Sequence, residues 1–445
     1  MKKYVKRTIE EKIFAALDQG LMVAILGARR TGKTTLLLRI KEVLEEKRGP
    51  KFVFYFSFDD PLLRAEVTSD FYFLKKQIEL SLGEKLEKLK EPVFLLVDEA
   101  QKVPSVFELF KILYDTRREK VKIVLSGSAS LGIQKKGAET LGGRIIYFYL
   151  YPFSIREVLG ESFSLKLPSP SFFEILKDGV DLDFLLKRQA LFYRKKETLE
   201  FILERMLLNG SLPEIFLTKD PKDRGRLFKS FVETYLEKDI CALEEVGSLE
   251  DFSRLLKLLA FETGNILNYN QLASTLGLSF NTVKKYLSIL LSSFVINRLN
   301  SYFPRIRKRL VKSPKFYFFD PGVANFLGRK ESSESLSPQT AGKYFENILV
   351  KSFEAYNRNE PYSFDAFFWR DYAGHEVDLV LKFGKKVLGV EFAKSKEISS
   401  KKLRNFRHFF KNFPQAEGFF VYEGEVRKFK VEEKEILCLP WWLWW

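Results

Sequence analysis

Short apolar runs alternate with helix-like spacing over the first third of the chain. Five runs are candidate strands, and they are LMVAILG, KFVFYFSF, PVFLLVDE, VKIVLSGS and RIIYFYLYPF. The residues between these runs place apolar side chains three or four positions apart, as amphipathic helices do. Because regular alternation of strands and helices is typical of a parallel sheet covered by helices, residues 1–158 are predicted to form a parallel α/β core.

The pattern changes after this core. Residues 159–245 are mostly helical with turns at KLPSPS and NGSLPE, and residues 246–327 are helical and then strand-like. Residues 328–445 return to mixed α/β structure, and the polar stretch GRKESSESLSPQ at their start is the expected linker. We therefore expect an α/β chain of four parts.

Composition limits the classes of partner and compartment. The chain has 445 residues, with 74 Lys and Arg against 58 Asp and Glu and a net charge of +16. This excess favours a polyanionic partner, nucleic acid before an anionic membrane surface, although a generally basic proteome would also produce it. Two cysteines and two histidines offer no disulfide framework and argue against a zinc site built on histidine. We see neither a signal-peptide core nor an apolar run long enough to cross a membrane, so we expect a cytoplasmic protein without a membrane partner.

One motif predicts a nucleotide site. LMVAILGARRTGKTTLLLRI contains the pattern G-x-x-x-x-G-K-T between an apolar strand and an apolar-periodic helix. Backbone N–H groups of such a loop wrap a phosphate, Lys33 should reach the β- and γ-phosphates of ATP, and Thr34 should bind Mg²⁺. Arg29 and Arg30 could contribute to binding or could be solvated loop charges. The expected ATP-binding residues are Gly27, Ala28, Arg29, Arg30, Thr31, Gly32, Lys33, Thr34 and Thr35.

Two acids supply the second half of this predicted site. In PVFLLVDEAQKV the buried strand Phe94 to Val97 delivers Asp98 and Glu99 to its carboxyl end, where ligands bind in parallel sheets. Asp98 would hold Mg²⁺ through water, and Glu99 would polarise the water that attacks the γ-phosphate. The predicted cofactors are therefore ATP and Mg²⁺.

Three further residues are candidates for catalysis. Ser126 and Ser128 end the strand in VKIVLSGSAS and could orient the attacking water, or they could belong to an ordinary turn. Arg144 follows soon after, and its charge could stabilise the transition state at the γ-phosphate of a neighbouring subunit. The alternative for Arg144 is a cation at a helix end. Only the first alternative implies a homo-oligomer.

A helix-turn-helix pattern lies in NYNQLASTLGLSFNTVKKYLSILLSSFVI. Leu272, Ala273 and Leu276 predict a short helix, Gly277 permits a tight turn, and Ser279 can cap the next helix. Apolar residues at helical spacing would bury one side of that second helix. Its open side would face DNA through Asn281, Thr282, Lys284 and Lys285.

A basic segment follows between two strand-like stretches, FVINRLNSYF and KFYFFD. The segment PRIRKRLVKSPK has no acid and suits contact with phosphates, which depends more on salt than on base sequence. As alternatives, this part could bind protein instead of DNA, or its charges could face solvent. The residues expected to contact DNA here are Arg305, Arg307, Lys308 and Arg309.

Three acids stand on apolar elements of the last part. Asp378 lies in HEVDLVLKF and Glu391 in KVLGVEFAKSK, both strand-like, and Glu346 lies in the helix-like AGKYFENILVKSF. Metal-dependent nucleases hold Mg²⁺ with two or three such carboxylates and use a lysine to steady the attacking water or the charged transition state. This arrangement indicates a nuclease site or the remains of one.

The order of several motifs resembles a known family. The motifs are GARRTGKTTLL, FLLVDEAQKV, VLSGSAS, GGRIIYFYLYPFSIREVL, NGSLPEIF, YLEKDI and KSPKFYFFDPGVANFL. Together they resemble a group of prokaryotic AAA-type ATP-binding proteins over nearly the whole chain. The resemblance implies an AAA+ P-loop core over 1–158, a helical lid with an insertion over 159–245, a winged helix-turn-helix over 246–327, and a restriction-endonuclease-like domain of the PD-(D/E)xK type over 328–445. That family has no single settled cellular role, so the resemblance implies an ATPase but not its task.

The nuclease pattern of that resemblance is incomplete in this chain. Its lysine stands two residues after the glutamate, because residues i and i+2 of a strand share a face. That position holds Ala393, and Lys394 would point away on a regular strand. We therefore expect an inactive site that binds nucleic acid or docks a partner. Its possible residues are Glu346, Asp378, Glu391 and Lys394.

These expectations combine into one hypothesis with two alternatives. The first is an ATPase that couples ATP binding and hydrolysis to DNA binding or remodelling. The second is a regulatory ATPase switch that binds a protein partner without DNA. The third is an ATP-dependent metal nuclease.

Overall fold

A computed structural model provides the fold. It describes residues 4–127, 139–164, 166–234, 246–303, 313–328 and 336–445. The chain divides into two compact units, one of Met1–Pro152 with Ser292–Phe294 and the other of Phe153–Leu291 with Val295–Trp445. Apart from Ser292–Phe294, the three parts expected after residue 158 fall in the second unit, and their boundaries stay predictions. Five predicted site residues lie outside the described residues, and these are Ser128, Arg305, Arg307, Lys308 and Arg309.

The first unit contains a parallel sheet of five strands in the order β2-β3-β4-β1-β5. All five candidate strands of the sequence are present, so the predicted parallel α/β core is confirmed. The strands are β1 (Met22–Leu26), β2 (Val53–Ser57), β3 (Val93–Asp98), β4 (Val121–Gly127) and β5 (Ile145–Tyr149). Every residue of β1 and of β3 is buried, because helices cover both faces of a parallel sheet.

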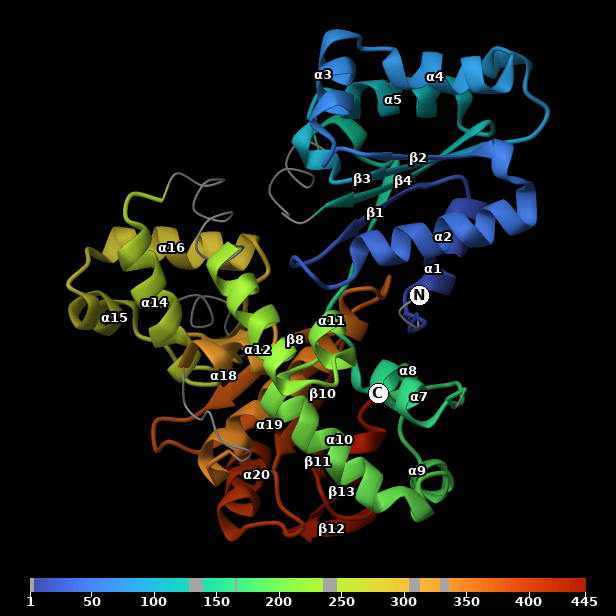
Figure 1. Cartoon of the computed structure of the whole chain (residues 1–445). Coiled ribbons are helices and arrows are strands. Elements are labelled where there is room, and N and C mark those ends of the chain that lie inside the picture. The colour runs from blue at the N-terminus through green and yellow to red at the C-terminus, as the bar shows by residue number, and fades with distance from the viewer. Residues whose placement is uncertain (1–3, 128–138, 165, 235–245, 304–312, 329–335) are drawn as a thin grey trace. The chain divides into compact units, whose positions relative to one another are not determined.

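Helices lie on both faces of this sheet (Figure 1). They are α1 (Glu10–Asp18), α2 (Lys33–Arg48), α3 (Pro61–Ser69), α4 (Phe73–Leu82) and α5 (Val106–Arg117), with short 3₁₀ turns at Pro50–Phe52, Leu86–Lys88 and Ala100–Lys102. Apolar side chains of α1 and α2, among them Ile13 and Leu37, form one buried cluster with Val23 and Leu96 of the sheet. This packing holds the N-terminus of α2 at the carboxyl end of β1.

The second unit begins with helices. They are α7 (Ile155–Phe163), α8 (Phe172–Ile175), α9 (Leu182–Ala190), α10 (Lys196–Asn209), α11 (Pro213–Leu217), α12 (Pro221–Ser230), α14 (Leu249–Phe261), α15 (Tyr269–Leu276) and α16 (Phe280–Ser292). A 3₁₀ turn lies at Tyr193–Lys195. Between α15 and α16, Gly277 has φ of 70°, which a glycine adopts without strain. The Oγ atom of Ser279 then accepts the backbone N–H of Thr282, so it caps the start of α16.

A mixed sheet of eight strands forms the rest of the second unit, in the order β12-β13-β11-β10-β9-β8-β6-β7. Its strands are β6 (Ile296–Ser301), β7 (Lys315–Phe318), β8 (Asp365–Arg370), β9 (Glu376–Phe383), β10 (Lys386–Phe392), β11 (Glu417–Tyr422), β12 (Arg427–Val431) and β13 (Lys434–Pro440). β6 is antiparallel to β7 and parallel to β8, with Ser301 opposite Phe368. The strand pair that follows α16 and the C-terminal strands therefore share one sheet.

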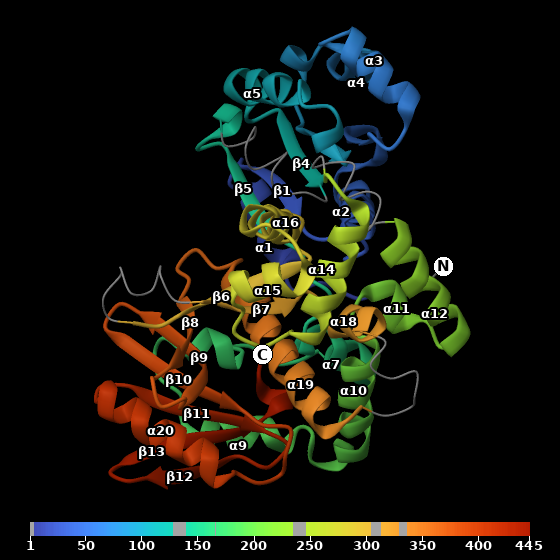
Figure 2. The ribbon, with the colours of Figure 1, turned by 90° about the vertical axis from the view of Figure 1, so that its left-hand side faces the viewer.

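Within the described residues of this unit, three further helices and a terminal turn are α18 (Pro321–Gly328), α19 (Pro338–Asn357), α20 (Ser400–Asn412) and the 3₁₀ turn Trp441–Leu443. α20 lies across the C-terminal strands (Figure 2). A side chain at Gly389 of β10 would put its Cβ 2.6 Å from the ring of Phe409, so glycine lets α20 approach the sheet closely. On the other side of β10, the ring of Phe392 contacts Trp444, whose Nε1 donates to the carbonyl of Leu349 in α19. Alternate residues of β10 therefore face α20 and α19.

Within the described residues, no helix combines the length and the apolar character that crossing a membrane requires.

Candidate functional site

The loop between β1 and α2 has two positions that only glycine fits. A Cβ atom at Gly27 would lie 2.2 Å from the carbonyl oxygen of Leu150. Gly32, directly before α2, has φ of 96°, in the left-handed region that favours glycine. The two glycines of the predicted phosphate loop are therefore required by the backbone that turns from strand to helix. That backbone ends at a helix N-terminus, which attracts phosphate.

The side chains of this loop are held by hydrogen bonds. The buried Lys33 Nζ donates to the carbonyl oxygens of Gly27 at 3.1 Å and Ala28 at 3.0 Å. Thr31 Oγ1 donates to the same Ala28 carbonyl at 2.8 Å, and Arg7 donates to the Thr31 carbonyl at 2.8 Å. The Lys33 ammonium thus lies along the inner side of the loop, where it can exchange these carbonyl oxygens for phosphate oxygens.

Burial lowers the pKa of Lys33, and the nearby carboxylates of Glu99 and Asp98 oppose this shift. A buried ammonium gains most from an anionic ligand, because little water remains around it.

Asp98 is the centre of the second half of the site. Thr34 Oγ1 donates to Asp98 Oδ2 at 2.7 Å, and the Tyr55 hydroxyl donates to the same oxygen at 3.2 Å. Ser126 donates to the other oxygen, Oδ1. Burial and the charge of Asp98 raise the pKa of Tyr55 to about 12, so this hydroxyl stays a donor at neutral pH. Thr34 and Asp98, the residues expected at Mg²⁺, are therefore in direct contact, and their oxygens are the ligand type that Mg²⁺ prefers.

Glu99 adjoins Asp98 at the end of β3. Its φ of 53° is unusual for a residue other than glycine, and its backbone N–H donates to Asp98 Oδ1 at 3.1 Å. Gln101 Nε2 donates to Glu99 Oε2 at 2.5 Å. Ser126 lies near the end of β4, between β3 and β1 as expected, and its hydroxyl is bonded to Asp98. This bond helps to orient Asp98, and the water-orienting role of Ser126 stays a prediction.

Arg144 lies at the amino ends of the strands in the same sheet, whereas the phosphate loop lies at their carboxyl ends. It directly precedes β5, which is parallel to β1, and Met22 pairs with Ile145 at the start of both strands. The phosphate loop follows the other end of β1. Arg144 Nε and Nη2 donate to the two carboxylate oxygens of Asp115 at 2.6 and 3.0 Å. Arg144 therefore cannot reach the phosphate loop of its own chain.

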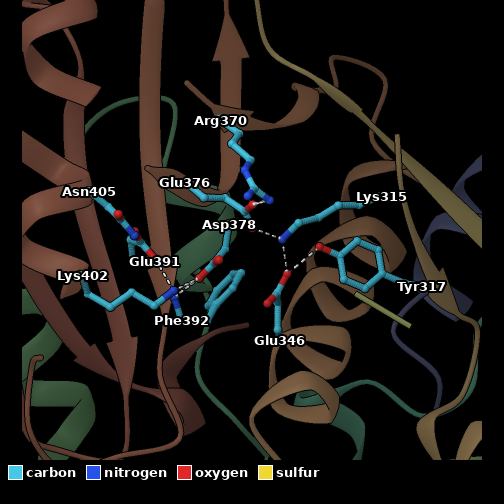
Figure 3. Close-up of polar contacts among 10 residues, drawn as sticks. All are labelled: Lys315, Tyr317, Glu346, Arg370, Glu376, Asp378, Glu391, Phe392, Lys402 and Asn405. Atoms are coloured by element: carbon cyan, nitrogen blue, oxygen red, sulfur yellow. Dashed lines mark hydrogen bonds and ion pairs between the residues drawn. The ribbon is translucent and has the colours of Figure 1, made fainter. Parts of the chain in front are cut away.

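A cluster of charged side chains lies between the second sheet and α20 (Figure 3). Asp378 of β9 and Glu391 of β10 both contact Lys402 of α20, whose Nζ is 2.6 Å from Asp378 Oδ2. Asn405 Nδ2 donates to Glu391 Oε1 at 2.9 Å, and the backbone N–H of Phe392 donates to Asp378 at 2.9 Å. We call Asp378, Glu391, Lys402 and Asn405 the carboxylate cluster. It brings together the two strand acids that the sequence singled out.

The lysine of this cluster is one that the sequence reasoning missed. Lys394 Nζ instead lies 2.8 Å from Glu204 and 3.8 Å from Glu423, so the structure does not bring Lys394 to Asp378 and Glu391. Lys402 lies on α20, the helix after β10, and contacts both Asp378 and Glu391. It therefore supplies a lysine to these acids, which Ala393 cannot do. No spacing rule marks Lys402, because the turn between β10 and α20 decides where that helix lies.

Glu346, the third predicted acid, is held by other partners (Figure 3). Its Oε1 accepts hydrogen bonds from Lys315 Nζ at 2.8 Å and from the Tyr317 hydroxyl at 2.7 Å. Lys315 also lies 2.5 Å from Glu376 Oε1. Burial raises the pKa of Glu346, although Lys315 opposes the shift. Glu346 is thus a neighbour of the carboxylate cluster that is engaged with β7.

The pKa values of the two acids in the cluster shift in opposite directions. Burial would raise the pKa of Asp378, but the charges of Lys402 and Lys315 outweigh it and lower this pKa. Burial raises the pKa of Glu391 well above its ordinary value, and Lys402 opposes this only in part. Asp378 therefore loses its proton more easily than Glu391 does.

The open side of α16 carries the residues predicted to face DNA. Asn281, Lys284 and Lys285 are exposed, while Thr282 is half-buried and bonds to the Ser279 hydroxyl at 2.8 Å. The opposite side is buried through Val283, Tyr286, Leu287 and Leu290. The amphipathic pattern is therefore as predicted.

Family comparisons divide the chain into three segments. Residues 19–159 match a family described as an AAA domain. Residues 200–334 match DUF8612 and residues 341–444 match DUF4143, each described as a domain of unknown function.

Curated relatives extend over almost the whole chain. The uncharacterized protein Rv2008c of Mycobacterium tuberculosis is 23% identical over 423 residues, covering 95% of this chain and 81% of the relative. The uncharacterized protein MJ1637 of Methanocaldococcus jannaschii is 25% identical over 444 residues, covering 99% and 88%.

Solved structures show weaker similarity. PCH-2 of C. elegans has a TM-score of 0.28 and 16% identity, covering 48% of this chain and 62% of that chain. DnaA of Aquifex aeolicus bound to AMPPCP has a TM-score of 0.26 and 17% identity, covering 62% and 85%. Scores this low carry no argument about function. The AAA-domain match agrees with the parallel sheet and the phosphate loop in the first third of the chain, and the segments that follow are similar to domains of unknown function.

Proposed function

We propose that this chain binds and hydrolyses ATP with Mg²⁺ and couples this cycle to binding or remodelling DNA. The observation that carries the ATP part is the contact of Thr34 with Asp98 beside the buried Lys33. Oxygens for a metal ion, a cation for phosphates and a glycine loop meet at one sheet edge. This combination is typical of P-loop ATPases.

Each residue has a role in this proposal. Backbone N–H groups of residues 27–34 would bind the phosphates, and Lys33 would leave its carbonyl partners to neutralise phosphate charge. Thr34 and Asp98 would hold Mg²⁺, which neutralises charge on the β- and γ-phosphates when bound. Glu99 would accept a proton from the attacking water, and Ser126 and Tyr55 would keep Asp98 oriented.

The ATP part is tested by calorimetry with ATP and by phosphate release. We expect Lys33→Ala to lose ATP binding and Glu99→Gln to bind ATP without hydrolysing it. Hydrolysis that persists in Lys33→Ala at the wild-type rate would contradict the assignment of the site.

The DNA part depends on charge and on α16. A net charge of +16 favours a polyanion, and the exposed Lys284 and Lys285 stand on the open side of a helix-turn-helix. The measurement is the ATPase rate and DNA affinity with single-stranded, duplex and branched DNA over a range of salt. Affinity that falls steeply with salt supports the proposal. No DNA affinity at about 50 mM salt would favour the protein-binding switch instead.

The proposal includes a homo-oligomer only if Arg144 can act on a neighbouring subunit. Arg144 would then either leave Asp115 and bind a phosphate of ATP in that subunit, or lie at the subunit contact while it stays paired with Asp115. Mass in solution with and without ATP, for wild type and Arg144→Ala, tests this. A monomer with full ATPase activity in both would remove the trans role.

One observation favours a second candidate, a metal-dependent nuclease. Lys402 supplies, at Asp378 and Glu391, the lysine that the strand itself lacks. Two carboxylates would hold Mg²⁺ there, and the lysine would steady the attacking water. DNA cleavage with Mg²⁺ or Mn²⁺ that disappears in both Asp378→Ala and Lys402→Ala would establish it. Absence of cleavage in wild type would leave the cluster as an inactive site.

A further inference from the structure

Both histidines of the chain lie together in the second unit. His375 ends the turn between β8 and β9, and His408 lies on α20. Their rings stack with centroids 3.6 Å apart and planes 12° apart. The sequence contains two histidines in all, and the fold brings them into contact from separate elements.

One carboxylate joins the two rings. Asp371 Oδ2 lies 2.8 Å from His375 Nδ1 and 3.6 Å from His408 Nδ1. The three ligand atoms all lie within 4.8 Å of one another. Two imidazole nitrogens and one carboxylate oxygen are thus close enough for side-chain rotation to bring them to a single ion.

The turn fixes the position of Asp371. Its Oδ1 accepts the backbone N–H of His375 at 2.9 Å, and its own N–H donates to the His375 carbonyl at 3.0 Å. The side chains of His375, Asp371 and His408 are 18%, 20% and 36% exposed. The carboxylate of Asp371 is therefore held by the turn, and all three side chains remain partly open to solvent.

We propose that Asp371, His375 and His408 bind a divalent transition-metal ion, with Zn²⁺ as the best match. Zinc accepts histidine nitrogen and carboxylate oxygen, and three protein ligands leave a fourth position for water. Binding requires the two rings to turn out of their stacked arrangement, so that both Nδ1 lone pairs point at one ion.

The proposed site is separate from the carboxylate cluster but shares its helix. An ion would tie the β8–β9 turn to α20, the helix that brings Lys402 to Asp378 and Glu391. Bound metal should therefore stabilise the docking of α20 on the sheet, since a ligand that binds only the folded state raises stability. Neither ATP nor DNA is involved, so this inference stands apart from the proposed function.

Zinc binding to the full chain without a polyhistidine tag tests the proposal. Zn²⁺ is titrated in excess Mg²⁺ and without nucleotide, with a chromogenic chelator as competitor. We expect one equivalent of Zn²⁺ to bind wild type. His375→Asn and His408→Asn should each weaken Zn²⁺ affinity by at least about 10-fold, since loss of even an outer hydrogen-bond partner costs that much.

The choice of variants separates metal binding from a structural role. Asparagine can still donate to Asp371, so both variants should keep the wild-type melting temperature without metal. Zn²⁺ should raise the melting temperature of wild type and leave that of the variants unchanged. Asp98→Asn, at the ATP site, should keep the wild-type Zn²⁺ titration.

Co²⁺ provides an independent readout, because its visible absorption reports nitrogen and oxygen ligation in a low-symmetry site. We expect this absorption in wild type and its loss in His408→Asn. Zinc affinity that is equal in wild type and in both histidine variants would overturn the proposal, and so would a wild type that binds no Zn²⁺. The histidines would then be a stacked pair beside Asp371 and no more.

Discussion

Lys402 Nζ lies 2.6 Å from Asp378 Oδ2 and also contacts Glu391, so one cation of a helix touches two acids on neighbouring strands. Asp378 and Glu391 are almost fully buried, with side-chain exposures of 5% and 0%. Buried carboxylates need such compensation, because water no longer solvates their charge. Because Lys402 lies on α20, the position of α20 affects the ionisation of Asp378 and Glu391.

Lys402→Met should therefore destabilise the second unit. It leaves the Asp378 charge buried without its nearest cation, which costs about 3–5 kcal/mol in the free energy of unfolding. Urea denaturation measures this, and Lys401→Met, at the exposed neighbouring position, is the control with little expected change. Adding Asp378→Asn to Lys402→Met should restore part of the loss. A Lys402→Met protein as stable as the control would contradict the ion-pair role.

Titration of Glu391 should make the free energy of unfolding depend on pH. Burial raises the pKa of Glu391 well above the ordinary 4.5, so the folded chain keeps a proton that the unfolded chain releases. The contribution of Glu391 to the free energy of unfolding is fully present below its ordinary pKa of 4.5. It is lost as the pH rises through the raised pKa of the folded chain.

Glu391→Gln mimics the protonated acid and cannot titrate. We expect its melting temperature to fall less than that of wild type between about pH 5 and about pH 8. Glu433→Gln, at an exposed position, is the control and should follow wild type. Parallel curves for Glu391→Gln and wild type would show that Glu391 titrates normally.

Substitution of Glu99 should reduce ATP hydrolysis much more than ATP binding. Glu99→Gln keeps a polar side chain beside Asp98 but removes the base, so we expect ATP hydrolysis to fall by roughly 10²–10⁴-fold. ATP affinity by calorimetry should stay within a few-fold of wild type. Glu84→Gln, an exposed acid in the same unit, should change neither quantity. Equal loss of binding and hydrolysis would instead make Glu99 a binding residue.

Gly27→Ala tests the close approach of the phosphate loop to Leu150. The added Cβ would meet the Leu150 carbonyl at 2.2 Å, so the loop must shift and ATP binding should be lost or strongly weakened. Gly225→Ala is the matched control, since that helical glycine faces open space and should tolerate alanine. ATP titration of both variants is the measurement. Wild-type affinity in Gly27→Ala would mean that the loop adapts.

DNA affinity should depend on the open side of α16. Removing both cations with Lys284→Ala and Lys285→Ala should weaken DNA binding for all sequences alike. The slope of log affinity against log salt should fall by about 1 for each phosphate that no longer has a lysine beside it. Lys257→Ala, an exposed cation on α14, should leave the slope unchanged. An unchanged slope in the double variant would remove α16 from the DNA interface.

Sequence reasoning succeeded where structure is local. The phosphate loop from Gly27 to Thr34 is one continuous strand-turn-helix, and its glycines, its lysine and its helix start are all encoded within a few residues. The same holds for the helix-turn-helix around Gly277, where a cap and apolar spacing are enough. Alternation along β10 also predicted that Lys394 would point away from Glu391.

The sequence by itself determined the parallel α/β core, the phosphate loop and the strand acids, because each depends on neighbours along the chain. Only the tertiary structure decided that Lys402 meets Asp378, that Arg144 pairs with Asp115, and that His375 stacks on His408. These pairs join residues on separate elements, and their contacts depend on how helices dock on sheets. Apolar packing sets that docking across many residues at once, so no spacing in the sequence marks which polar side chains it will bring together.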